Sequence, residues 1–226
     1  MNKTMKTLLS VACVCTLVVS TIIGTVAYLT ASKSVTNTFT VGDVNIKLEE
    51  TLIKDGEATN EKTEVGNQYH MVPGESYVKD PTVTIVAGSE PCYVRMLVTL
   101  NKVDVLMDAL GDDFLPQNYV EGWDAEKWEC VKITDKGNNV FTYEFRYKTT
   151  VDASEEEQDK ALEPLFTKIN VPGTFTNEDL KALYGTPAQG QEVGEFNILV
   201  EAHAIQAATF ANADAAWAAF DVQNAQ

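Results

Sequence analysis

Few residues of this chain could carry out metal or acid–base chemistry, because it contains only two histidines, His70 and His203. Glu201 lies two positions before His203 on a predicted strand, where such residues share a face, so one carboxylate could lie beside one imidazole. A catalytic zinc needs about three protein ligands and a general base, and no H-E-x-x-H motif is present. The simpler interpretation of these histidines is a place at the surface or rim of the fold, and we predict no metal site and no cofactor.

Other kinds of catalytic site have no better support. A serine or cysteine triad needs a histidine as general base, and only two histidines are present. Cys92 falls on the apolar face of a predicted strand, where nothing would activate its thiol. No glycine-rich phosphate loop is present. Asp112-Asp113 and the run at 155–157 could attract calcium, but neither follows the spacing of an EF-hand, so solvated acidic surfaces explain them more simply. We predict that the protein has no catalytic residues and is not an enzyme.

Four cysteines are present, and two of them, Cys13 and Cys15, lie in an apolar leader. Cys92 and Cys130 therefore remain for the rest of the chain, which permits one disulfide in an oxidising compartment. The alternative is a pair of buried free thiols that behave as small apolar residues. Sequence spacing does not show whether the two side chains meet, so both interpretations stay open.

The charge is strongly and unevenly distributed. The formal net charge is −16, and residues 1–27 contribute only Lys3 and Lys6, so the remainder carries 15 basic and 33 acidic residues, a net charge of −18. Such a surface repels nucleic acid and anionic membranes, and we expect neither as a partner. The 226 residues are enough for one domain with a substantial core.

The N-terminus has the order of a secretory signal peptide. A basic start that ends at Lys6 is followed by a long apolar run and then by small residues at the −3 and −1 positions, Thr25 and Ala27. We predict cleavage between Ala27 and Tyr28. Because no charge occurs between Lys6 and Lys33, the alternative is a permanent membrane anchor. In both cases the rest of the chain is exported, and it meets the membrane only through an uncleaved leader.

The residues after the leader alternate like a strand. Apolar side chains at Val35, Phe39 and Val41, with Asn37 between them, share one face, and threonines occupy much of the other. At Gly42 the phase of the pattern flips, which indicates a bulge or a turn. We therefore divide the chain into a signal peptide (1–27), an N-terminal arm (28–43) and a β-sandwich domain (44–226).

The eight residues 34–41 would reach about 26 Å when extended. An extended segment can add to an exposed sheet edge, where main-chain hydrogen bonds give affinity and side-chain pockets give register. On a second copy of the chain such pairing would propagate without closing, as a fibre. The alternative is an arm that folds back as the first strand of its own domain.

Several segments resemble the TasA/camelysin family. Gly24-Thr25-Val26-Ala27 with Tyr28-Leu29-Thr30, then Asn37-Thr38-Phe39-Thr40 and Gly42-Asp43-Val44, resemble the start of these proteins, although Ala31 stands where an acidic residue is frequent. The segments PGESYVKDPTVTIVAGSEPCYVRMLV (73–98) and VEAHAIQAATFANADAAWAAF (200–220) are similar to further parts of the family.

The resemblance implies a bacterial protein that is exported, is cleaved by a dedicated SipW-type signal peptidase and forms fibres of the extracellular biofilm matrix. The expected partners are other copies of the chain, the signal peptidase and other matrix proteins, at the cell surface or in the matrix. Two alternatives are a cell-surface binding protein that does not polymerise and, less favoured, a secreted metalloprotease, because camelysin-like relatives have been described as metal-dependent.

The remaining pattern predicts an all-β sandwich with short helices in its connections, and the resemblance implies a jelly roll preceded by an N-terminal signal helix. Residues 92–100 alternate most clearly, and the aromatic residues of 141–147 share a face that is more often core than a binding strip. We expect a polar loop at 54–68. The other expected strands are at 44–48, 77–86, 128–134, 140–150, 165–171 and 196–204, and the expected helices are at 103–110, after Ser154, at 177–183 and at 212–220.

Overall fold

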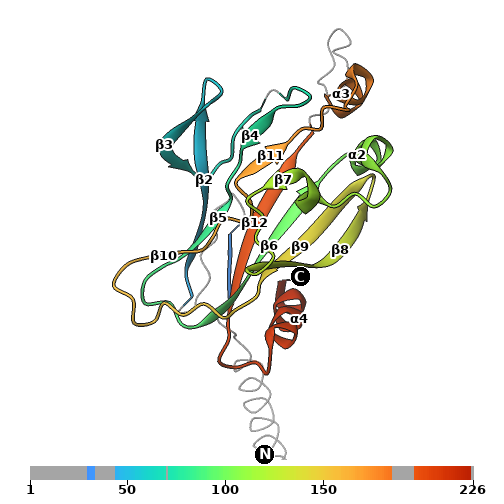
Figure 1. The fold of residues 1–226 in the computed structure, drawn as a ribbon. Coiled ribbons are helices and arrows are strands. Elements are labelled where there is room, and N and C mark those ends of the chain that lie inside the picture. Colours follow the sequence, from blue (N-terminus) through green and yellow to red (C-terminus); the bar gives the residue numbers. More distant parts are fainter. Residues whose placement is uncertain (1–29, 34–43, 70, 185–195, 225–226) are drawn as a thin grey trace, which may run out of the picture.

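The described part of the chain forms three antiparallel sheets with a few short helices, as expected for an all-β sandwich (Figure 1). This computed structural model describes residues 30–33, 44–69, 71–184 and 196–224. The five-stranded sheet has the order β1 (Thr30–Lys33), β12 (Ile198–Gln206), β6 (Cys92–Leu100), β9 (Val140–Tyr147), β8 (Trp128–Gly137). The four-stranded sheet has the order β10 (Lys160–Ala161), β5 (Thr82–Ile85), β2 (Ile46–Lys54), β3 (Glu57–Thr63), and the three-stranded sheet β4 (Ser76–Val78), β11 (Lys168–Asn170), β7 (Val120–Glu121).

The central strand β6 supplies much of the core, and its predicted alternation is confirmed. Its even-numbered residues from Cys92 to Leu100 are all buried, because successive side chains of a strand point to opposite faces. They pack in one cluster with inward residues of β9, such as Phe145, and with Val83 and Ile85 of the four-stranded sheet. The aromatic face of β9 is therefore core, as expected.

The strands expected at 128–134 and 140–150 are present as β8 and β9, and they pair as a hairpin. Asn138 and Asn139 connect the two strands with φ angles of 53° and 60°. Positive φ at both central residues is the mark of the type I′ turn, whose twist suits a two-residue hairpin, and asparagine tolerates it well.

Three local predictions are wrong. Residues 54–68 are not one loop, because β3 occupies part of them and pairs with β2. The two strands join through Asp55 and Gly56, which have φ angles of 53° and 83°.

The predicted helix after Ser154 is absent, because the Ser154 backbone N–H and hydroxyl both donate hydrogen bonds to the Asp152 carboxylate in a local turn. The single strand expected at 77–86 is broken into β4 and β5 next to Pro81, which has no N–H for a sheet ladder.

Helices lie at the three other predicted places, as α2 (Val103–Leu110), α3 (Asn177–Tyr184) and α4 (Ala213–Asn224), and a further short helix is η1 (Pro116–Tyr119). Of these, η1 was not expected. Asn212 caps α4 by accepting a hydrogen bond from the Ala215 N–H at 2.9 Å. Trp217 and Phe220 of α4 pack with Ile205 in a separate buried cluster. Because Ile205 and Ala204 point to opposite faces of β12, α4 covers the face of the five-stranded sheet that looks away from the main core.

The N-terminal boundary is described only in part. Within the predicted arm (28–43), residues 30–33 form β1 and pair antiparallel with β12 of the same chain, from Thr30 opposite Ile205 to Lys33 opposite Ala202. The signal peptide, with Thr25, Ala27 and Tyr28, lies outside the described residues. So do the arm residues Val35, Asn37, Phe39, Val41 and Gly42.

Candidate functional site

Among the described residues, only part of one edge of β12 has a strand partner. On one side β12 pairs with β6 along its whole length, from Ile198 to Gln206. On the other side β1 pairs with residues 202–205, and residues 198–201 have no strand partner in the part of the chain that the structure describes. Unpaired N–H and C=O groups at a sheet edge are a template for another strand. This open edge is the candidate site.

Two adjoining cavities follow the open edge. One, of about 210 Å³, lies between residues 197–200 on one side and residues 48–50 of β2 with the end of β3 on the other. The next, of about 320 Å³, is lined by Tyr69, Tyr77 and Phe196 among others. The two cavities share Asn67, Lys79, Asn197 and Ile198 in their walls, so they form one groove along β12.

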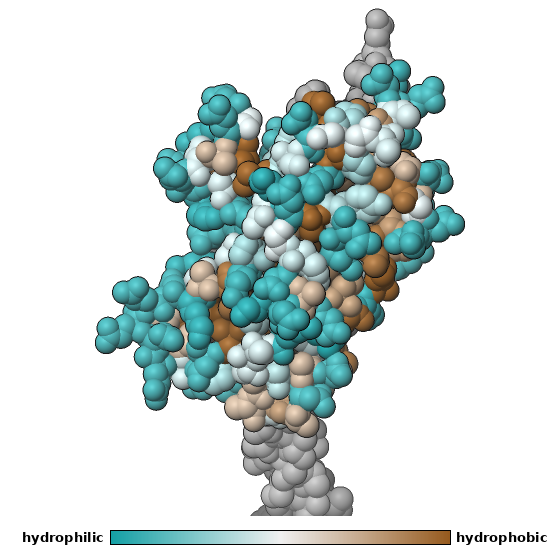
Figure 2. Space-filling model, in the orientation of Figure 1, coloured by the Kyte–Doolittle hydropathy of each residue, from teal (hydrophilic) through white to brown (hydrophobic). Residues whose placement is uncertain are grey.

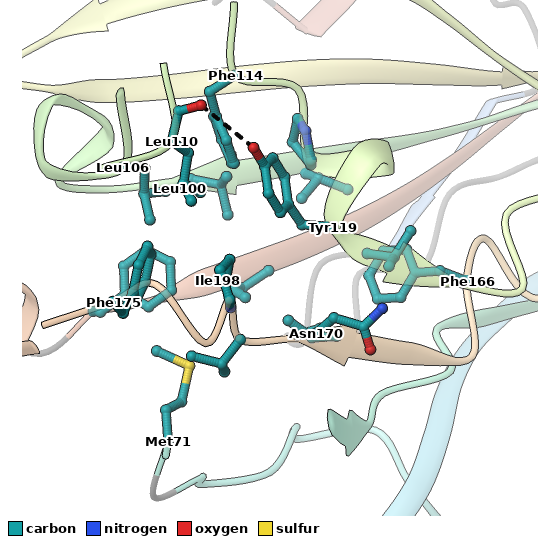
Figure 3. A pocket seen from close by; sticks show the side chains of 17 residues that line it. Met71, Leu100, Leu106, Leu110, Phe114, Tyr119, Phe166, Asn170, Phe175 and Ile198 are labelled. Carbon is teal, nitrogen blue, oxygen red and sulfur yellow. Dashed lines mark hydrogen bonds between the residues drawn. The ribbon is translucent and has the colours of Figure 1, made fainter. Parts of the chain in front are cut away.

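The groove continues into a smaller apolar cavity of about 70 Å³, and Met71, Ile169, Phe196 and Ile198 line both. Figure 3 shows Phe114, Leu110 and Tyr119 on one side of it and Met71 and Phe175 on the other, with Ile198 between them. Over the rest of the visible surface hydrophilic residues predominate, and apolar residues form separate patches (Figure 2). This end of the groove therefore suits an apolar side chain, whereas its other end is mixed.

A buried ion pair stands in the wall of the groove. Lys79 Nζ donates to Glu50 Oε2 at 2.7 Å, and the two side chains are only 8% and 7% exposed. Asn67 Nδ2 donates to the other carboxylate oxygen of Glu50 at 2.9 Å and to the Thr51 carbonyl at 2.8 Å. The side-chain amide oxygen of Asn67 accepts a hydrogen bond from the Ile53 N–H at 2.8 Å. Buried charges persist when they are paired and hydrogen-bonded, so this cluster is a fixed polar point in the wall of the groove.

The structure does not bring Cys92 and Cys130 together. Both are free thiols, Cys92 buried at the start of β6 and Cys130 half-buried on β8. Strand β9 lies between β6 and β8, and two inter-strand spacings amount to about 10 Å. Burial raises the pKa of the Cys92 thiol to about 12, so this sulfur is a poor nucleophile as well as a poor candidate for a bridge.

His203 lies away from the groove, on the face of β12 that α4 covers. Its ring stacks on Phe220 with centroids 4.8 Å apart, and its Nδ1 accepts a hydrogen bond from Arg95 Nε at 3.2 Å. Burial, with the positive Arg95 beside it, lowers the pKa of His203 to about 4. Among the described residues no group of three or more histidine, cysteine or acidic side chains is placed to hold a metal ion. His70 is outside those residues.

Comparisons with known proteins found no match to this chain among family models, curated proteins or solved structures. In residues 30–33, 44–69, 71–184 and 196–224, no helix has both the length and the apolar character needed to cross a membrane.

Sequence reasoning missed the polar cluster of the groove, although one signal was available. Glu50 continues the buried run Val44, Ile46 and Leu48, the last two of which lie on the same face of β2 as Glu50. A carboxylate in phase with core positions requires a buried partner. The partner, Lys79, comes from the connection between β4 and β5, and no local pattern could have identified it.

Proposed function

We propose that the mature chain is a secreted structural protein of the extracellular matrix, which polymerises into fibres by exchange of its N-terminal segment after the leader is removed. The observation that carries the proposal is the open edge of β12, which continues directly from the edge that β1 occupies. We further propose that the sandwich has jelly-roll topology and that residues 1–27 form the signal helix.

The register of β1 on β12 supports the arm as the occupant. The pairing has no bulge: each step of one residue along β1, from Thr30 opposite Ile205 to Lys33 opposite Ala202, is matched by one step back along β12. Continued in this register, Val35 would stand opposite Val200 and Phe39 opposite Phe196. Opposed residues of antiparallel strands share a face, and Val200 is buried on the core side. The apolar face of the arm would therefore enter the groove, with Phe39 toward its apolar end.

The same pairing can be made within one chain or between two. Exchange of an identical element between copies needs no new kind of contact, and when each copy donates its arm to one neighbour and accepts an arm from another, an arrangement that does not close extends as a filament. While the leader is attached, the arm is held near the membrane, so cleavage frees the segment for a neighbour. Lower pH should favour assembly, because it reduces the self-repulsion of the chain without residues 1–27, which has a net charge of −18.

The first test is deletion of residues 34–41 from the mature chain that begins at Tyr28. We expect a folded monomer that forms no regular fibres by electron microscopy, whereas the intact mature chain forms them, more readily at pH 5 than at pH 8. Circular dichroism of the deletion variant confirms that its domain is folded. Regular fibres from the deletion variant would exclude exchange of the arm.

A second test distinguishes exchange from an arm that folds back. In the continued register Thr36 would stand opposite Leu199, and both would face outward; the Leu199 side chain is exposed. One copy carries Thr36→Cys and the other carries Leu199→Cys, each in a Cys130→Ser background. A disulfide between the two variants, identified by mass spectrometry, can form only across copies. If neither mixed disulfides nor fibres form, the protein does not polymerise and a cell-surface binding role fits better.

A further inference from the structure

We propose that the buried Glu50–Lys79 pair is a subsite for the carboxamide of Asn37 from a neighbouring copy, and that this contact fixes the register of the exchanged arm. The inference rests on the proposed function above, and it adds a residue that determines which of several pairings is made. Asn37 is a polar residue in an otherwise apolar pattern, and the Glu50–Lys79 pair belongs to a polar cluster in the wall of the groove.

Asn37 is the exception on its face of the arm. The other inward positions, Val35, Phe39 and Val41, are apolar. In the register of β1 on β12, Asn37 would stand opposite Ile198. Ile198 lines both larger cavities of the groove, and Lys79 and Asn67 are two of the three polar wall residues that accompany it in both, the third being Asn197. In this register the Asn37 side chain would therefore lie beside the polar cluster in the wall of the groove.

The pair has hydrogen-bonding capacity left for an amide. A lysine ammonium has three donors, and in the described part of the chain the Lys79 ammonium makes one hydrogen bond, to Glu50. The Glu50 carboxylate accepts from Lys79 and from Asn67, and its two oxygens have about four acceptor positions. A carboxamide supplies both an acceptor oxygen and a donor N–H₂ group, so Asn37 could bond Lys79 and Glu50 together.

This arrangement discriminates against a slipped arm. A slip of one residue turns the apolar face outward, and that error is excluded by burial alone. A slip of two residues keeps the correct face, and it would place Val35 or Phe39 against the ion pair and Asn37 against an apolar wall. The Asn37 carboxamide would then be desolvated without a partner, and the remaining donor positions of Lys79 would be covered by an apolar side chain. A single buried asparagine sets the register of coiled coils in the same way.

The test measures register with cysteine reporters in mixed copies of the mature chain, again in the Cys130→Ser background. The acceptor carries Leu199→Cys and the donor carries either Thr36→Cys, which reports the native register, or Thr38→Cys, which reports a slip of two. We expect the native disulfide to exceed the slipped one by a factor on the order of ten. Donors that also carry Asn37→Leu should bring this ratio close to one. Thr40→Leu, which adds the same side chain on the outward face, should leave it unchanged.

A reciprocal change tests the groove. An acceptor with Glu50→Leu and Lys79→Met presents an apolar wall, so it should restore the native register for the Asn37→Leu donor and lose it for the wild-type donor. Circular dichroism shows whether this acceptor folds. If it does not, the Asn37→Leu donor on the wild-type acceptor decides the matter, because a change in the arm leaves the folded domain unaltered.

The two proposals can fail separately. An Asn37→Leu donor that keeps the wild-type preference for the native register would overturn the subsite, while the exchange of arms would stand. Fibres from the chain without residues 34–41, with no mixed disulfide from either donor, would overturn exchange itself and the subsite with it.

Discussion

Arg95 Nε donates a hydrogen bond to Nδ1 of His203 across 3.2 Å, so that nitrogen of the imidazole carries no proton. Arg95 is 3% exposed, and its guanidinium carbon lies 4.4 Å from the ring centroid of Trp217 and 4.9 Å from that of Phe220. Its Nη2 also donates to Asp221 at 2.6 Å. One buried cation on β6 thus holds α4 by cation–π and charge-assisted contacts.

The first prediction concerns the pH dependence of stability. The pKa of His203 falls from its usual 6.5 to about 4 in the fold, so between these values the unfolded state binds more protons and the folded state loses stability as pH drops. We expect a loss on the order of 3 kcal/mol between pH 7 and pH 4 from this residue, measured by urea unfolding. His203→Gln should remove that part of the slope. Parallel curves for wild type and variant would contradict the prediction.

The second prediction concerns the anchoring of α4. Trp217 is 1% exposed, and truncating a buried tryptophan costs about 3–5 kcal/mol. We expect Trp217→Ala to lower the free energy of unfolding by that amount and to release Arg95 from its cover. Val222→Ala, on the same helix at a side chain that is 76% exposed, should change stability by no more than about 0.5 kcal/mol. Circular dichroism measures unfolding of both variants. If the two substitutions lower the free energy of unfolding equally, packing of α4 contributes little to stability.

The parts of the fold that are encoded locally were predictable. The period-2 pattern of 92–100 matches β6, and helical spacing gives α2 with the correct bounds, Val103–Leu110. The errors also have local causes. Strand β3 is polar because most of its residues are exposed, so it lacks the alternation that a half-buried strand shows. The Asp55-Gly56 turn was the available signal, since that dipeptide favours a two-residue hairpin.

Of the two partners in the proposed pairing, only the arm could be predicted from the sequence. The alternating face of the arm can be read from its own residues, whereas the edge that it would meet depends on contacts that are distant in sequence. Ile198 pairs with Leu100 on one side of β12, and the groove wall combines Glu50, Asn67 and Lys79 from separate segments. Local periodicity contains no information about which strands are neighbours, so neither the open edge nor the ion pair could be inferred.

A third prediction compares two glycines with positive φ. A side chain at Gly56 (φ 83°) would meet open space, whereas a Cβ at Gly122 (φ 74°) would lie 2.5 Å from Thr167 Oγ1 and 2.7 Å from its Cγ2. Gly56→Ala should therefore cost only the backbone strain of about 1–2 kcal/mol. Gly122→Ala should cost about 1–3 kcal/mol more, because Thr167 packs on β7 and must move. Thermal unfolding of both variants measures the difference, and equal losses would show that Thr167 yields freely.

A fourth prediction concerns the thiols. Burial raises the pKa of both cysteines, to about 12 for Cys92, and β9 separates their strands. We expect iodoacetamide to label Cys130 slowly and Cys92 only after unfolding, and we expect mild oxidation of the native monomer to form no internal disulfide. Mass spectrometry of tryptic peptides measures both. A Cys92–Cys130 linked peptide from native protein would require that β8 and β6 move toward each other.

The last prediction compares one charge on the two faces of the arm. In the register of β1 on β12, position 35 would point into the groove beside Val200, and position 36 would point outward beside Leu199. Val35→Asp and Thr36→Asp add the same charge to the mature chain, so their effects on solubility and self-repulsion are equal. Only Val35→Asp would bury a carboxylate against an apolar wall without a partner, which is strongly unfavourable. We therefore expect fibres from Thr36→Asp and soluble monomer from Val35→Asp, by sedimentation and electron microscopy. Fibres from both variants, or from Val35→Asp alone, would mean that the arm does not enter the groove by its apolar face.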